Sequence, residues 1–192
     1  MLPYFELIQV PNLQKISAEI AGQLDVLIPD RRFKRVGYGF NRVAPEALLQ
    51  ASPALCEYLD SVGLKDHLGP SGLPWAEPGV FGMVHQDVHW SEGINMPVIG
   101  EGYGAWYDAE PLERVKSSKP GSADTSREQG AYIPCSTEQI TELARVSNDL
   151  AFWVNTKIPH NGVNTGTTPR VVMCLRFDVP LNPQEINAKV AQ

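Results

Sequence analysis

Between Val80 and Val179 the chain consists of short apolar segments separated by turns, and this pattern restricts its fold more than any other feature. The clearest segments are residues 80–85, 94–99, 104–107, 151–156 and 170–179. They are rich in valine, phenylalanine, tryptophan and leucine, which favour strands. Several short strands in succession predict a β-barrel or β-sandwich.

The N-terminal third has a different character. Apolar residues recur at helical spacing from Leu13 to Leu24, and a second helical stretch begins at Pro45 and ends near Gly63. Residues 68–79 are rich in glycine and proline and predict a connector. We therefore expect one domain over residues 1–192, in which residues 1–79 form a helical support and residues 80–180 form the mainly β core.

Three further segments allow more than one interpretation. Residues 113–130 are polar and predict either a flexible flap over a site or an exposed loop. Residues 137–146 fit a short helix or a strand. The last residues, 182–192, predict a frayed or weakly helical tail.

Charge and composition exclude several classes of function. The formal net charge is -6, and no basic block is longer than Arg31-Arg32. Binding to nucleic acid or to an anionic membrane surface is therefore disfavoured. Residues 1–9 show no signal-peptide pattern, and the apolar stretches are too short to span a bilayer. The scattered cysteines Cys56, Cys135 and Cys174 predict free thiols, so we expect a cytoplasmic protein; the oligomeric state stays open.

The sequence His85-Gln86-Asp87, followed far downstream by His160, has the composition of a metal site. On a strand, residues i and i+2 point to the same face, so His85 and Asp87 can converge on one ion. Two histidines and one carboxylate form the facial triad of non-haem Fe(II), although the same ligands also suit zinc or manganese. We expect His67 to be an ordinary surface or core residue and His89 to lie at the rim of the site.

Arg170 lies ten residues after His160 and begins an apolar strand. A guanidinium there either extends outward to solvent or meets an anion inside, where its planar fork suits a carboxylate. Arg176 has the same strand parity and is the competing candidate. Arg170 is preferred because we expect it to lie near His160, with Arg176 about 20 Å further along the strand.

Polar and aromatic residues surround this region in sequence. Asn95 and Tyr107 are candidate hydrogen-bond partners for a bound keto acid. The alternative for the aromatic residues around them, Trp90, Tyr103 and Trp106, is ordinary core packing.

The chain resembles the 2-oxoglutarate- and Fe(II)-dependent oxygenases in the pattern of His85, Asp87, His160 and Arg170. The segment 95–98 with Trp106-Tyr107 is similar to small bacterial and phage members. Residues 158–172 are similar to the aspartyl/asparaginyl β-hydroxylase-like branch. The resemblance covers roughly residues 80–179.

This resemblance implies a double-stranded β-helix, the cupin-like jelly roll. It implies that His85, Asp87 and His160 bind Fe(II) and that Arg170 binds the distal carboxylate of 2-oxoglutarate. O2 and a small-molecule or peptide substrate would be the partners, and a C–H bond would be hydroxylated with release of succinate and CO2. The chain departs from the pattern at Val172, where many members have serine. It also retains Asp87, whereas some β-hydroxylase relatives lack the carboxylate.

Two other functions fit the same sequence. One is a cupin-like metalloenzyme that uses the triad without 2-oxoglutarate. The other is a jelly-roll binding or structural module whose metal site is vestigial. Substitution of Arg170 distinguishes the first alternative from the oxygenase, because such a metalloenzyme should keep its activity. Substitution of His85 or Asp87 distinguishes the second, because a vestigial metal site is not needed for function.

Overall fold

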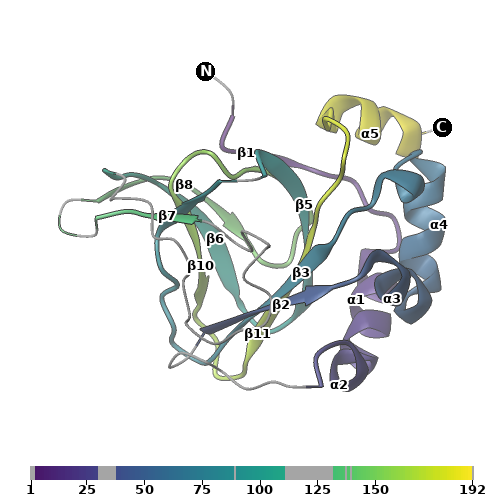
Figure 1. Ribbon diagram of the computed structural model, residues 1–192, viewed down its shortest axis with the longest axis horizontal. Helices are drawn as coiled ribbons and strands as arrows, with labels where there is room; N and C mark the ends of the chain where they lie inside the picture. The colour runs from purple at the N-terminus through teal and green to yellow at the C-terminus, as the bar shows by residue number, and fades with distance from the viewer. Residues whose placement is uncertain are drawn as a thin grey trace, which may run out of the picture.

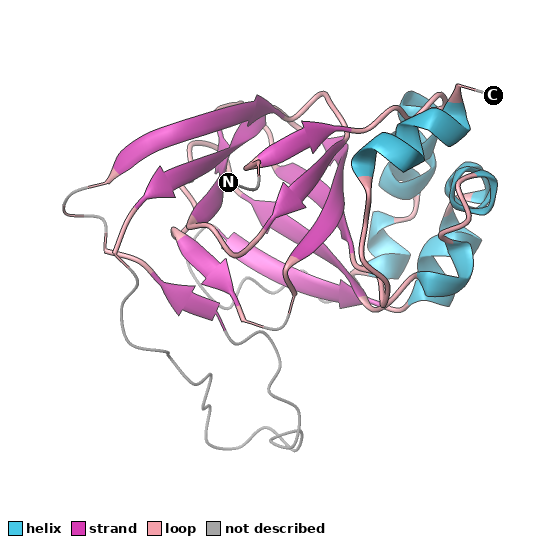
Figure 2. Ribbon diagram, turned by 90° about the horizontal axis from the view of Figure 1, so that it is seen from above, coloured by secondary structure: helices cyan, strands magenta, loops and turns pink. Residues whose placement is uncertain are grey.

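Two antiparallel β-sheets face each other, and helices cover the outer face of one of them (Figures 1 and 2). The structure is a computed structural model that describes residues 3–29, 38–88, 90–110, 132–136, 138 and 140–191. The strands of the larger sheet lie beside the helices, and the smaller sheet lies on the far side of the molecule (Figure 1).

The larger sheet has six strands in the order β1-β9-β5-β11-β3-β2, and the smaller sheet has five in the order β7-β4-β10-β6-β8. The strands are β1 (Phe5–Leu7), β2 (Tyr38–Val43), β3 (Ser71–Ala76), β4 (His85–Asp87), β5 (Glu92–Ile99), β6 (Gly102–Asp108), β7 (Tyr132–Pro134), β8 (Thr141–Ser147), β9 (Phe152–Asn155), β10 (His160–Asn164) and β11 (Arg170–Leu175). The helices are α1 (Leu13–Gly22), α2 (Leu24–Leu27), α3 (Pro45–Ala51), α4 (Pro53–Ser61), the short 3-10 helix η1 (Lys65–His67) and α5 (Pro183–Val190).

The strand order identifies the fold as a jelly roll. Eight strands, β3, β4, β5, β6, β8, β9, β10 and β11, follow one another and alternate between the sheets except at β6 and β8. The first pairs with the eighth, the eighth with the third and the third with the sixth in one sheet; the second, seventh, fourth and fifth make the other. This is the double-stranded β-helix that the family resemblance implies. Strands β1, β2 and β7 extend the sheets at their edges.

Local sequence explains where the helices begin and end. Ser52 caps α4, because its hydroxyl accepts a hydrogen bond from the Leu55 amide, and Pro53 takes the first helical position. Gly63 follows the helix with a φ of 71°, a conformation that glycine adopts without strain. Asn182 caps α5 in the same way as Ser52 caps α4.

The main apolar core lies between the helices and the larger sheet. Alternate residues of β11, namely Val171, Met173 and Leu175, enter this core and are fully buried. Ile94 and Met96 of β5 do the same. Because side chains alternate along a strand, the residues between them face the space between the two sheets. That interior face carries the candidate site.

Several expected boundaries are wrong, and each error has a physical reason. Residues 1–79 contribute β1, β2 and β3 as well as helices. Strand β3 falls inside the expected connector, because its glycine and proline do not prevent a buried strand that is covered on both faces. Residues 80–84 do not form the expected strand. They run beside β10 through single contacts such as the Phe81–Val163 bridge, and β4 begins only at His85.

Other predictions were closer. Residues 141–146 of the ambiguous segment 137–146 belong to β8, so the strand was the better interpretation of this part, while residues 137 and 139 lie outside the described residues. The C-terminal tail is the helix α5, not a frayed end. The three cysteines are free. The expected flap at residues 113–130 and the rim residue His89 lie outside the described residues. Within the described ranges, no helix is both long enough and apolar enough to cross a membrane.

Candidate metal centre

The three predicted ligands come together on the smaller sheet. His160 begins β10 and is the register partner of His85 on β4. Nitrogen and oxygen atoms that could bind a metal, one each from His85, Asp87 and His160, all lie within 4.8 Å of one another. The Nε2 of His85 and the Oδ1 of Asp87 are 3.7 Å apart. Two ligands that are each about 2.1 Å from one ion can adopt such a separation.

Backbone carbonyls set the orientation of both imidazole rings. The Nδ1 of His85 lies 2.8 Å from the carbonyl oxygen of Met83, and the Nδ1 of His160 lies 2.9 Å from that of Ile158. A carbonyl can only accept, so Nδ1 carries the proton in each ring. Nε2 is then the unprotonated nitrogen, as a metal ligand requires.

Electrostatics favour the same protonation state. Burial in the interior, and to a smaller extent the adjacent His85 ring, lower the pKa of His160 to about 4. The two ring centroids are 4.6 Å apart, so two positive rings would repel each other. His160 is therefore neutral at pH 7, which is the form that binds a metal.

The backbone around the ligands is tied together at the same end of the barrel. The Asp87 amide donates to the Thr156 carbonyl, and the Lys157 ammonium donates to the carbonyls of Asp87 and Val88 at 3.1 and 2.7 Å. These bonds join the end of β4 to the segment that leads into His160. The ligands thus stand on a connected backbone frame.

Arg170 crosses the interior from the larger sheet toward the smaller one. Its side chain passes over two glycines, since a Cβ on Gly102 would lie 2.9 Å from its Cδ and a Cβ on Gly162 would lie 2.7 Å from its Nη1. The residue is 6% exposed, and its Nε has no hydrogen-bond partner. Burial lowers the pKa of Arg170, because the loss of hydration disfavours its charged form.

The position of Gly162 relates Arg170 to the metal ligands. Gly162 follows His160 by two residues on the same face of β10, a step of about 7 Å along a strand. The guanidinium of Arg170 therefore lies beside the residue that is two positions after the ligand His160. The missing side chain at Gly162 leaves its place to the guanidinium.

Arg176 directly follows β11, and the metal ligand Asp87 lies at this end of the strand, contrary to expectation. Its Nη2 donates to the Oδ2 of Asp87 at 3.1 Å, so it is the arginine in direct contact with a metal ligand. The expectation that Arg176 is remote from the site is wrong. Antiparallel pairing explains this: Leu175 lies opposite Ile94 at the start of β5, shortly after the ligand strand β4.

The two predicted cosubstrate contacts separate. Asn95 faces the interior, since its neighbours Ile94 and Met96 face the helices, and its Oδ1 is buried without a partner. Tyr107 lies on the outer face of the smaller sheet, where its hydroxyl donates to the Oδ1 of Asn161 at 3.1 Å. The structure does not bring Tyr107 to the triad, because the alternation along β6 turns Trp106 inward instead.

Two interior residues were not anticipated from the sequence. Tyr38 on β2 is electrostatically coupled to Arg170 and Cys174, and burial raises the pKa of Tyr38 far above its usual value. Burial likewise raises the pKa of Cys174 to about 11. Both side chains are therefore neutral. The parity of β11 could have identified Cys174, but no sequence signal predicted β2.

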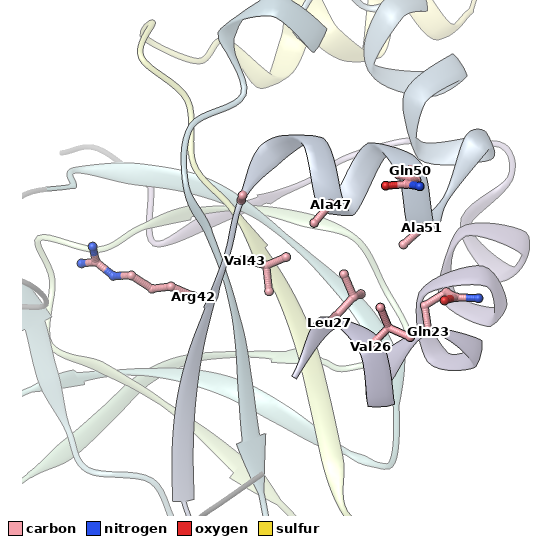
Figure 3. A pocket seen from close by; sticks show the side chains of 9 residues that line it. Gln23, Val26, Leu27, Arg42, Val43, Ala47, Gln50 and Ala51 are labelled. Carbon is pink, nitrogen blue, oxygen red and sulfur yellow. The ribbon is translucent and has the colours of Figure 1, made fainter. Parts of the chain in front are cut away.

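A separate cavity of about 450 Å³ lies where β2 meets the helices (Figure 3). Val43 points toward it from β2, while Arg42 leaves the opposite side of the strand. Its other lining residues are Gln23, Val26, Leu27, Ala44, Ala47, Gln50 and Ala51. None of the triad or of the interior arginines belongs to this lining, and it has no grouping of catalytic side chains.

Comparison with known proteins adds few details. The sequence matches no protein-family model and no curated protein. Vicilin from the hazelnut Corylus avellana is similar in structure, with 16% identity and a TM-score of 0.40 over 77% of this chain and 31% of that chain. A mutant of Bacillus subtilis oxalate decarboxylase gives 11% identity and a TM-score of 0.41 over 81% of this chain and 30% of that chain. The chain thus spans less than a third of either protein, and the fold assignment depends on the strand order.

Proposed function

We propose that this protein is an Fe(II)- and 2-oxoglutarate-dependent oxygenase. The observation that carries the proposal is the buried Arg170, for which the described residues provide no carboxylate partner and whose guanidinium lies beside Gly162, two residues after the ligand His160 on β10. A metalloenzyme that used the triad alone would have no need for this cation. A dicarboxylate that binds the ion at one end and Arg170 at the other explains both features.

The residues of the triad fit Fe(II). Two neutral imidazoles and one carboxylate are the protein ligands of the facial triad, which leaves positions for a cosubstrate and O2. The side chains of His85 and Asp87 are 22% and 21% exposed, so both can be reached by an ion. When bound, the iron and 2-oxoglutarate would supply the oxidising chemistry, in which O2 and 2-oxoglutarate give succinate, CO2 and one hydroxylated C–H bond.

The protein residues would bind and orient the cosubstrate. The Arg170 guanidinium would accept the distal carboxylate in its planar fork, and Asn95 would offer a polar contact in the same interior. Tyr38, which keeps its proton and interacts electrostatically with Arg170, would offer a hydroxyl hydrogen bond there. The apolar residues Trp106 and Phe152 close part of the interior against water.

Anaerobic titration tests the proposal. Purified protein is loaded with Fe(II), 2-oxoglutarate is added, and the weak visible charge-transfer band of the chelate is recorded. We expect a saturable band in the wild type, no band in H85A, and a band in R170M that needs about 10–100-fold more 2-oxoglutarate. R42M is the matched control, because Arg42 is an exposed arginine on the edge strand β2.

The outcomes separate the competing functions. Metal binding without a band at any cosubstrate concentration would contradict the oxygenase and favour a metalloenzyme that does not use 2-oxoglutarate. No metal binding at all would favour the binding module with a vestigial site. A band that R170M leaves unchanged would remove the role of Arg170.

A further inference from the structure

Both buried charged residues of the described chain are arginines. Arg170 is 6% exposed and Arg176 is 9% exposed, while the aspartates and glutamates of the described ranges are more accessible. Both side chains enter the same interior, Arg170 from the start of β11 and Arg176 from just after its end, and Arg176 contacts the carboxylate of Asp87 there. Among the described residues, these two guanidinium groups and Asp87 leave one more positive than negative charge in the interior.

The proposed iron and cosubstrate do not remove this excess. A divalent ion and doubly negative 2-oxoglutarate cancel each other, so the two arginines and Asp87 still leave one uncompensated positive charge. A buried charge without a counter-ion is costly. A second anion with a single negative charge would compensate it.

Arg176 has a hydrogen-bond donor for such an anion. Its Nη2 is used by the Oδ2 of Asp87, but its Nη1 is buried and has no partner. Gly93 makes room for this end of the guanidinium, because a Cβ there would lie 2.1 Å from Nη1. Like Arg170, Arg176 thus lies over a glycine with a donor unsatisfied.

We propose that Arg176 binds the carboxylate of the substrate that is oxidised, next to the metal. This inference rests on the proposed function and specifies its substrate class: a small molecule or peptide with a carboxylate near the reacting C–H bond. Nη2 keeps Asp87 in place as a ligand, and Nη1 binds the substrate. A carboxylate fits the charge better than a phosphate, which carries nearly two negative charges at neutral pH.

Paramagnetic relaxation of acetate tests this assignment. Mn(II) replaces Fe(II), 2-oxoglutarate is added to saturation, and the relaxation rate of the acetate methyl protons is measured as acetate is titrated. Neutral acetamide is the matched probe. We expect a saturable increase in the relaxation rate for acetate and none for acetamide, and about 10-fold or greater weakening of acetate binding in R176Q.

R176K guards against loss of the metal site in R176Q. Lysine keeps a positive charge beside Asp87, so Mn(II) should stay bound, but its single ammonium cannot hold Asp87 and the probe in the arginine geometry. We expect acetate to bind R176K more weakly than the wild type. R42Q should behave as the wild type.

Three results would overturn the inference. The first is acetate that relaxes no faster than acetamide, the second is acetate that relaxes equally in R176Q, and the third is R176K that binds acetate as tightly as the wild type. Each of these leaves the oxygenase proposal standing if Mn(II) and 2-oxoglutarate bind. Failure of Mn(II) or 2-oxoglutarate to bind in the preceding titrations would instead refute the proposed function, and this inference with it.

Discussion

The two faces of β11 differ sharply, although they belong to one six-residue strand. Val171, Met173 and Leu175 face the helices and pack in the main apolar core. The intervening positions face the interior. Arg170 at the start of the strand and Arg176, the residue directly after it, place two guanidinium groups there. The first face stabilises the fold, and the second carries buried charge with unsatisfied donors. Stability and the candidate chemistry are therefore separated by the alternation of the strand alone.

Glycines on the neighbouring strands β5 and β10 also distinguish the interior from the helix side. Gly162 and Gly93 each leave space that an arginine of β11 occupies. On the side that faces the helices, apolar side chains fill the space next to the sheet. The comparison predicts that substitutions on the helix side change folding, whereas those on the interior side change binding.

The largest effect is expected on the helix side. M173A should lower the free energy of unfolding by about 2–5 kcal/mol, because Met173 is fully buried and alanine leaves a cavity. Urea denaturation measures this loss. The metal affinity of the protein that remains folded should equal that of the wild type; a large loss of metal affinity would mean that the two faces are not independent.

A pH titration of the metal-free protein should locate the next effect on the interior side. The folded pKa of His160 is about 4, below the value of about 6.5 for an unfolded histidine, so only the unfolded state takes up the proton between these values. The stability from this group is complete above pH 6.5 and falls as the pH drops toward 4, by up to about 3 kcal/mol. H160Q should lose this slope relative to the wild type, and M173A should keep it.

R170M should separate binding from stability. Replacement of a buried guanidinium that has no carboxylate partner among the described residues by an apolar side chain of similar length should leave the free energy of unfolding unchanged or raise it. The affinity for 2-oxoglutarate should fall by about 10–100-fold. Isothermal titration calorimetry and urea denaturation measure the two quantities. A strongly destabilised R170M would show that Arg170 serves the fold.

The smallest effect is expected at Val172, between the two arginines. V172S adds the hydroxyl that many similar proteins have, and the affinity for 2-oxoglutarate should rise by up to about 10-fold through one added hydrogen bond. The cosubstrate-free protein should lose about 1–3 kcal/mol of stability, because the buried hydroxyl then lacks a partner. Unchanged cosubstrate affinity would mean that the carboxylate does not reach this position.

Sequence reasoning succeeded where a period of two residues carried the information. It placed His85 and Asp87 on one face of a strand, and it gave Arg170 and Arg176 the same parity. It also predicted a β-barrel or β-sandwich from the succession of short strands, and the two facing sheets agree with this. These successes depend on local alternation, which a sequence displays directly.

It failed where long-range pairing decides the result. The register of β11 with β5 decides which end of β11 approaches the metal site. We expected Arg176 to be remote from this site, whereas it contacts Asp87. Tyr107 turns outward because side chains alternate along β6. The register of β6 with β8 also shifts between Trp106 and Tyr107. Tyr38 escaped notice because β2 pairs with β3, a strand that resembles a connector. Such contacts join residues far apart in the chain.

A crystal structure of the protein with Mn(II) and 2-oxoglutarate tests the central claim most directly. The account predicts an ion bound by His85, Asp87 and His160, with the distal carboxylate of 2-oxoglutarate on the guanidinium of Arg170 and Nη2 of Arg176 still on Asp87. An ion at other residues, or a 2-oxoglutarate whose distal carboxylate lies away from Arg170, would contradict it.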